Sequence, residues 1–170
     1  SYGTSILNPD QWDGYAPARE RLFATIRDNG IDNVVVTAGD IHSAWCSDLT
    51  SNPWSEAYGA NGAGVVAVEF VTPAVSSPGP IPDPQMAAGQ AQQLQAISPH
   101  MKYVDLWRRG YVLLDVTHER VQGEVWHVPT VDARAAGEVL SAAYVNEAGR
   151  NFLQPAAGAS AARAAPPPAP

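Results

Sequence analysis

The sequence has little cysteine, little positive charge and no long apolar run, and each shortage excludes a class of protein. Cys46 is the only cysteine among 170 residues, so no disulfide forms within the chain and the redox compartment stays open. The ten Lys and Arg residues are scattered and the net charge is −7, which argues against a nucleic-acid-binding or anionic-membrane-binding surface. No apolar run is long enough to predict a transmembrane segment.

The overall composition is that of a globular domain, with 45% apolar and 16% charged residues. The chain starts at Ser1 without a signal segment, so we expect a processed or excised piece of a longer protein. From about Pro155 the sequence contains mostly Ala, Gly and Pro. Such a segment buries too little apolar surface to offset its ordering entropy. We therefore predict a folded unit over residues 1–150 and a disordered tail or linker over residues 151–170.

Periodicity and turn residues predict an α/β fold. The strand at 33–37 is apolar without alternation, as is typical of a strand covered on both faces. Strands 111–116 and 121–128 alternate and form a hairpin, so one of their faces is expected to be wet. The other predicted elements are an amphipathic helix at 15–29, a surface loop at 52–64, a strand at 65–71, an irregular segment at 72–79 and a short helix at 86–97.

The most informative motif is Gly39-Asp40-Ile41-His42, which directly follows the first predicted strand. In the turn after a buried strand, an Asp and a His two positions apart can aim a carboxylate and an imidazole at one point. Hydrolases hold metal ions in this way at the edge of a sheet. The alternative is structural: Gly39 ends the strand, Asp40 caps a turn and His42 is a polar loop residue.

The remaining histidines and the cysteine carry weaker signals. His100 lies in an irregular connection, where functional groups concentrate, and either lines an active site or packs in the core. His118 is expected to be a solvated turn residue and His127 a structural one. Cys46 is a possible thiolate ligand, but a small buried side chain is the favoured interpretation. Asp48 is a weak candidate for a group that orients a metal ligand.

Five segments together resemble the PhoD-type alkaline phosphatases and phosphodiesterases of the metallophosphoesterase superfamily. They occur in the order expected for that family and span roughly residues 8–150. The segments are WDGY at 12–15 with the Arg-rich helix after it, VVTAGDIHS at 35–43, VEFVTPAVSSPG at 68–79, PHMKYVDL at 99–106 and RGYVLLDVT at 109–117.

The resemblance implies half of a four-layer αββα sandwich with mixed sheets. It also implies a site of iron and calcium ions, in which Asp40 lies on the calcium side and His42 on the iron side. Oxygen suits a hard cation and imidazole suits iron. We further expect His100, as a catalytic residue, and the loop at 72–77 to line the pocket for a phosphate ester. Such enzymes are exported, so the expected location is periplasmic or secreted.

The chain also departs from the family pattern. The other expected metal ligands, a Cys, a bridging Asp with a nearby Tyr, and an Asn, belong to an amino-terminal half whose motifs are missing here. Cys46 stands in the wrong place to replace that Cys. We therefore expect a carboxyl-terminal half that needs an amino-terminal half as its partner.

Two other hypotheses stay open at this stage. One is a structural or assembly subunit that keeps the fold without activity, in which case neither metal would bind. A related phosphodiesterase that uses manganese or zinc is a third option, against which the PHMKYVDL segment speaks.

Overall fold

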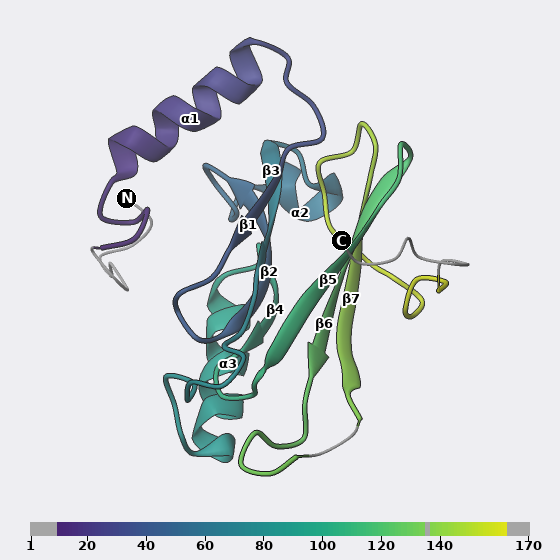
Figure 1. The fold of residues 1–170 in the computed structure, drawn as a ribbon. Helices are drawn as coiled ribbons and strands as arrows, with labels where there is room; N and C mark the ends of the chain where they lie inside the picture. Colours follow the sequence, from purple (N-terminus) through teal and green to yellow (C-terminus); the bar gives the residue numbers. More distant parts are fainter. Residues whose placement is uncertain (1–9, 135–136, 163–170) are drawn as a thin grey trace.

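The computed structural model describes residues 10–134 and 137–162. In this part of the chain two four-stranded sheets pack face to face, and helices cover the other side of the first sheet (Figure 1). The elements are α1 (Ala16–Asp28), β1 (Val35–Ala38), β2 (Ala44–Thr50), α2 (Glu56–Asn61), β3 (Val65–Val71), α3 (Pro84–Ile97), β4 (Met101–Asp105), β5 (Gly110–Val116), β6 (Arg120–His127), β7 (Val139–Glu147) and β8 (Gln154–Pro155).

The first sheet has the strand order β1-β3-β2-β4 and is mixed. β1 runs parallel to β3, whereas β2 is antiparallel to both β3 and β4. The ends of β1, β3 and β4 and the start of β2 therefore share one edge, at the bottom of Figure 1. The second sheet is antiparallel throughout, in the order β5-β6-β7-β8. We call the shared edge of the first sheet the lower edge.

Alternation along the strands separates the core from the helix layer. On the inner face of the first sheet, Val68 and Phe70 pack against Val125 of the second sheet. On the outer face, Ala67 meets α1, and Val104 meets α3. α3 begins where the Asp83 carboxylate accepts a hydrogen bond of 2.7 Å from the backbone N–H of Met86. The buried residues of α3, at spacings of four and three, are Ala87, Ala91 and Leu94.

A buried carboxylate, that of Asp48, joins four separate segments. Its Oδ2 lies 3.1 Å from Lys102 Nζ and accepts a 2.9 Å hydrogen bond from the Tyr58 hydroxyl of α2. Its Oδ1 accepts a 2.9 Å hydrogen bond from the backbone N–H of Leu153. The Lys102 ammonium also lies over the ring of Phe152, 4.7 Å from its centroid. This group of residues, the Asp48 cluster, links β2, α2, β4 and the segment that enters β8.

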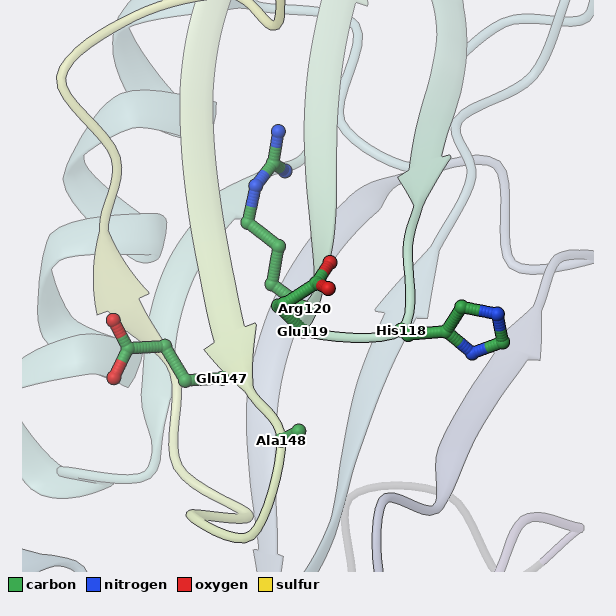
Figure 2. A pocket seen from close by; sticks show the side chains of 5 residues that line it. All are labelled: His118, Glu119, Arg120, Glu147 and Ala148. Carbon is green, nitrogen blue, oxygen red and sulfur yellow. The ribbon is translucent and has the colours of Figure 1, made fainter.

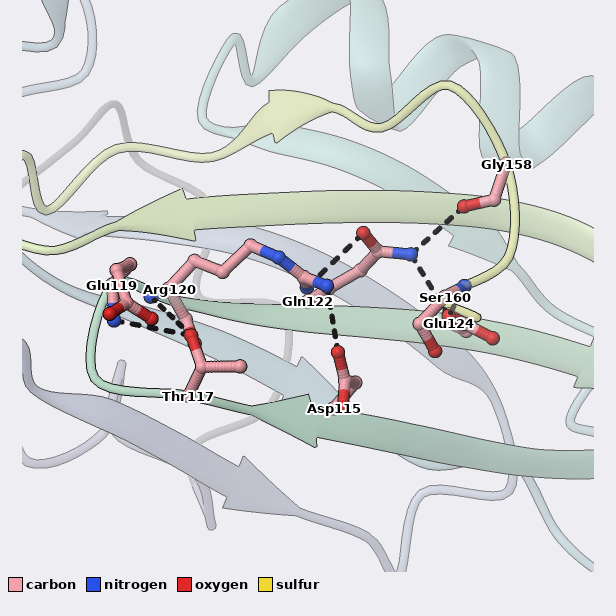
Figure 3. A network of polar contacts seen from close by, with 8 residues as sticks. All are labelled: Asp115, Thr117, Glu119, Arg120, Gln122, Glu124, Gly158 and Ser160. Carbon is pink, nitrogen blue, oxygen red and sulfur yellow. Dashed lines mark hydrogen bonds and ion pairs between the residues drawn. The ribbon is translucent and has the colours of Figure 1, made fainter. Parts of the chain in front are cut away.

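Residues 156–162 continue across the outer face of the second sheet. Glu124, only 1% exposed, accepts hydrogen bonds from Gln122 and from the backbone N–H of Ser160. Gln122 also donates to the Gly158 carbonyl, and Arg120 joins this network to Asp115 (Figure 3). Although burial favours its neutral form, the hydrogen bonds from Ser160, Trp126 and Gln122 hold the pKa of Glu124 below its ordinary value.

The predicted tail therefore needs correction. Residues 151–162 are packed rather than disordered, because Leu153 inserts between the sheets and side chains on both sheets accept hydrogen bonds from the segment's backbone. Residues 163–170 lie outside the described residues. The expectation of a wet face is confirmed on β5, where Leu113 is 40% exposed, but it was wrong on β6, where the segment covers Gln122 and Glu124. A second helical layer is absent from the described ranges, where this segment takes its place on that face.

Most predicted elements are confirmed, with a few exceptions. The helices at 15–29 and 86–97, the strand at 65–71 and the hairpin are present within three residues of their expected ends. β2, β4, β7 and β8 were not predicted, and the expected loop at 52–64 contains α2. The expectation that the first strand is covered on both faces is confirmed for its first half, where Val35 packs against the core between the sheets and Val34 and Val36 pack against α1. β1 is an edge strand in the described part of the chain, and Thr37 and Ala38 are exposed.

None of the described helices combines the length and the apolarity that crossing a membrane would require.

A glycine in β6 allows the two sheets to approach each other. A Cβ at Gly123 would overlap the ring of Phe70, which is itself 1% exposed. Gly123→Ala should lower the free energy of unfolding by about 1–3 kcal/mol, measured by denaturant titration. Gly89→Ala is the matched control, because a Cβ there meets open space and alanine favours the helix. Equal effects of the two exchanges would contradict this role for Gly123.

The Asp48 cluster makes a separate prediction. Asp48→Ala leaves the Lys102 ammonium, the Tyr58 hydroxyl and a backbone N–H without their acceptor, and should lower the free energy of unfolding by about 3–5 kcal/mol. The control is Asp28→Ala, which removes an ion pair on the surface of α1 and should change stability by less than about 0.5 kcal/mol. Both values come from thermal or denaturant unfolding.

Candidate metal and phosphate site

Three chain segments meet at the lower edge of the first sheet. The turn at 39–43 connects β1 to β2, the segment at 72–79 follows β3, and the segment at 106–109 connects β4 to β5. Backbone hydrogen bonds hold them together: the Thr72 N–H donates to Ala38 and the Gly110 N–H donates to Ala74. Gly79 is required at this junction, since a Cβ there would lie 2.5 Å from the Trp107 Cα. The edge is therefore a rigid junction of loops.

Asp40 and His42 project from a tight turn at this edge. The Ile41 N–H donates to the Gly39 carbonyl at 2.9 Å, and Asp40 has a φ of 72°. These features define a γ-turn with positive φ at its centre, a rare and strained conformation. His42 also has a positive φ, of 54°. Strain of this kind persists where surrounding contacts impose it, and it concentrates at functional sites.

The imidazole of His42 is held in a manner typical of metal ligands. Its Nδ1 lies 3.2 Å from the carbonyl oxygen of Pro78. A carbonyl can only accept, so Nδ1 carries the proton and the Nε2 lone pair is left for another partner. Histidines that bind metals usually donate their second ring N–H to a carbonyl or carboxylate in this way. The geometry therefore fits a metal bound at Nε2.

The described residues do not complete a metal site. They contain no group of three or more His, Cys, Asp or Glu side chains arranged to hold an ion. Asp40 and His42 are both exposed, as ligands would be if further donors came from outside this segment. Calcium needs six to eight oxygen ligands, so two side chains are too few.

Beside this turn, a partly buried polar network connects the first sheet to the second. Arg108 Nε lies 2.7 Å from the Asp105 carboxylate, and the same guanidinium donates to the hydroxyls of Tyr103 and Ser141. The Ser141 hydroxyl lies 2.8 Å from His127 Nδ1. Burial, with Arg108 adding to the effect, lowers the pKa of His127 to about 4, so this histidine is neutral at pH 7. The prediction of a structural His127 is consistent with this setting.

The structure does not bring His100 to Asp40 and His42. His100 precedes β4, and its carbonyl accepts a hydrogen bond from the Asp48 N–H. The opposite end of β4, Asp105, pairs with Ala44, about 16 Å further along the strand. Burial, with Lys102 adding to the effect, lowers the pKa of His100 to about 4. Its catalytic assignment stays a prediction, and its observed neighbours are the Asp48 cluster and the Trp54 ring.

The other candidate residues lie away from the lower edge. Cys46 is fully buried between the sheets, and burial raises the pKa of its thiol to about 12, which leaves it protonated. Asp48 contacts Lys102 and the backbone of Leu153 in the Asp48 cluster, and it does not orient a candidate metal ligand. A surface concavity of about 490 Å³ includes His118, but it lies at the far end of the second sheet, where the His118 ring points away from Glu119 and Glu147 (Figure 2).

Comparison with known proteins identifies this arrangement. The sequence profile of the PhoD-like phosphatases matches residues 2–125, which is more than half of the chain. The chain belongs to the PhoD-like phosphatase family. It is 28% identical over 157 residues to alkaline phosphatase D of Bacillus subtilis (strain 168), covering 91% of this chain and 25% of that protein. The solved structure of PhoD superposes with a TM-score of 0.73 at 27% identity, covering 94% of this chain and 29% of that one.

These comparisons confirm the family and the fold class. They correct the size of the piece, because this PhoD-like chain spans about a quarter of the relatives it matches rather than half. The two sheets with a helical layer are part of the expected sandwich. Sequence reasoning missed the pair of Asp105 and Arg108 near the site. The two residues are three positions apart in one turn, so the spacing was visible in the sequence, whereas the hydrogen bond from Arg108 to Ser141 depends on the packing of the second sheet.

The buried histidines predict a dependence of stability on pH. Their folded pKa of about 4 lies below the ordinary 6.5, so the unfolded state binds protons first as pH falls. Stability should be complete above about pH 6.5 and decline below it, by up to about 1.4 kcal/mol per pH unit for each histidine. His127→Asn keeps a group able to bond Ser141 and removes one of these contributions.

This prediction is measured by denaturant unfolding of both proteins from pH 8 to pH 5. The difference in stability between the wild-type protein and His127→Asn should be constant above pH 7 and should change steadily below pH 6.5. A difference that is independent of pH throughout would show that protonation of His127 does not oppose folding.

Proposed function

We propose that this chain supplies part of the metal site of a phosphoric ester hydrolase, an alkaline phosphatase or phosphodiesterase. Membership of the PhoD-like phosphatase family supports the class of reaction. The observation that carries the assignment to residues is the hydrogen bond from His42 Nδ1 to the Pro78 carbonyl, because it leaves Nε2 for a metal. Asp40, two residues away in the same strained turn, adds a carboxylate.

The proposed ions are iron and calcium. The imidazole nitrogen of His42 suits iron, and the carboxylate oxygens of Asp40 suit calcium. When bound, such ions polarise phosphoryl oxygens and lower the pKa of a bound water. In this proposal Asp40 and His42 bind the ions. The Pro78 carbonyl orients the His42 imidazole and keeps it in the tautomer with the proton on Nδ1. The loop at 72–77 borders the same edge and is the proposed wall for the phosphate ester.

The partner in this proposal is the amino-terminal part of the same enzyme. Two observations support it: the chain spans about a quarter of its relatives, and the two candidate ligands are too few for either ion. β1 is the edge strand next to these ligands, and its exposed end offers backbone groups to a further strand. The proposal includes export to the periplasm or the medium.

The incomplete ligand set also favours a second candidate, a subunit that keeps the fold without activity. Metal content separates the two. The intact enzyme should contain iron and calcium in near-stoichiometric amounts, whereas a non-catalytic subunit in its assembly should contain neither. Manganese or zinc in their place would indicate a related two-metal phosphodiesterase.

Asp40→Asn tests the proposed ligand directly. The exchange keeps the size of the side chain but removes a negative oxygen donor, so the intact enzyme should lose calcium and lose turnover by more than about 100-fold. Metal content by elemental analysis and hydrolysis of 4-nitrophenyl phosphate are the two measurements. Asp28→Asn, an exposed position on α1, is the control and should keep both. Full metal content and activity in Asp40→Asn would exclude this site.

A further inference from the structure

Arg109 lies close to the proposed metal ligand His42. Its Nε donates to the Ser77 carbonyl at 3.2 Å, and His42 Nδ1 lies 3.2 Å from the carbonyl of the next residue, Pro78. Consecutive Cα atoms are about 3.8 Å apart, so two adjacent carbonyls of one loop hold the guanidinium and the imidazole. The hydrogen bond through Nε fixes the side chain and leaves the two terminal amino groups of Arg109 for another partner.

The two neighbouring arginines differ in what balances their charge. Arg108 pairs with Asp105 and donates from all three nitrogens, to Asp105, Tyr103 and Ser141. Arg109 forms no ion pair with any carboxylate of residues 10–134 or 137–162. In a chain of net charge −7, an arginine that is fixed in place without a counter-ion indicates a site for an anion.

A small cavity adjoins Arg109. It has a volume of about 150 Å³ and is lined by Trp107, Arg108, Arg109, Val128, Pro129, Thr130 and Val131. The Thr130 hydroxyl accepts a hydrogen bond from the Asp132 N–H at 3.1 Å, so its own proton remains available to donate. Ligand pockets usually exceed 300 Å³, so this cavity fits one substituent rather than a whole ligand.

We propose that Arg109 and Thr130 form a subsite for a second anionic group, one that the leaving group of the substrate carries in addition to the phosphoryl group that is cleaved. The proposal rests on the proposed function, because it takes the phosphoryl group to be bound beside Asp40 and His42. Arg109 supplies a planar pair of N–H donors and Thr130 a hydroxyl donor, which together match a carboxylate or a phosphate. The apolar lining holds the carbon atom next to that anion and strengthens the contact by excluding water.

The test compares two small phosphate monoesters with the intact enzyme, this chain together with its amino-terminal part. Glycerol 3-phosphate has an uncharged leaving group, and 3-phosphoglycerate carries a carboxylate on the same three-carbon skeleton. Wild-type kcat/KM should favour 3-phosphoglycerate. Arg109→Gln can keep the hydrogen bond to Ser77 while removing the charge. This exchange should lower kcat/KM for 3-phosphoglycerate by about 10- to 100-fold, mainly through a higher KM. The loss of kcat/KM for glycerol 3-phosphate should be several-fold smaller.

Arg109→Lys restores the charge without the planar fork and should recover part of the preference. Arg150→Ala removes an exposed arginine at the far end of the second sheet and should keep the wild-type ratio of the two kcat/KM values. Equal losses for both esters in Arg109→Gln, or a wild-type enzyme without the preference, would overturn the subsite alone. A wild-type enzyme that hydrolyses neither ester nor 4-nitrophenyl phosphate would instead remove the proposed function, and the subsite with it.

Discussion

The buried carboxylate of Asp48 is the interaction on which most of the tertiary structure depends. It lies between the two sheets and is held by a cation from β4, a hydroxyl from α2 and a backbone N–H from the segment entering β8. A charge in this position is costly unless its donors are present, so the cluster couples the stability of the four segments. The cluster thereby turns an Ala/Pro-rich segment of little apolar area into a fixed part of the fold.

The two ends of the molecule differ in the contacts that they contain. The end near α2 and the Asp48 cluster is closed by buried ionic and aromatic contacts. The lower edge carries loops, the residues Asp40 and His42 with positive φ, and a pair of arginines. The strained turn at Asp40 is sustained because its neighbours are paired strands: β1 lies on β3, and β2 lies between β3 and β4.

Much of this could be predicted from the sequence, and the misses have physical causes. The Gly39–His42 turn and the strands β1 and β3 were predictable because β-branched runs and glycine act locally. β2 and β4 were missed because they carry Cys46, Asp48 and Lys102, whose place in a strand is decided by contacts with distant segments. The buried Glu124 looked like a solvent-facing residue for the same reason, since residues 158–160 cover it only after the chain has returned. Local patterns carry no information about such contacts.

The exposed end of β1 has a consequence for how this chain associates. Within the described residues, Thr37 and Ala38 lie at a sheet edge with no strand on their open side, and they carry no charge, proline or bulge that would discourage another strand from adding there. Two copies of this chain can therefore pair through that edge when no other strand covers it, and repeated pairing of this kind leads to fibres.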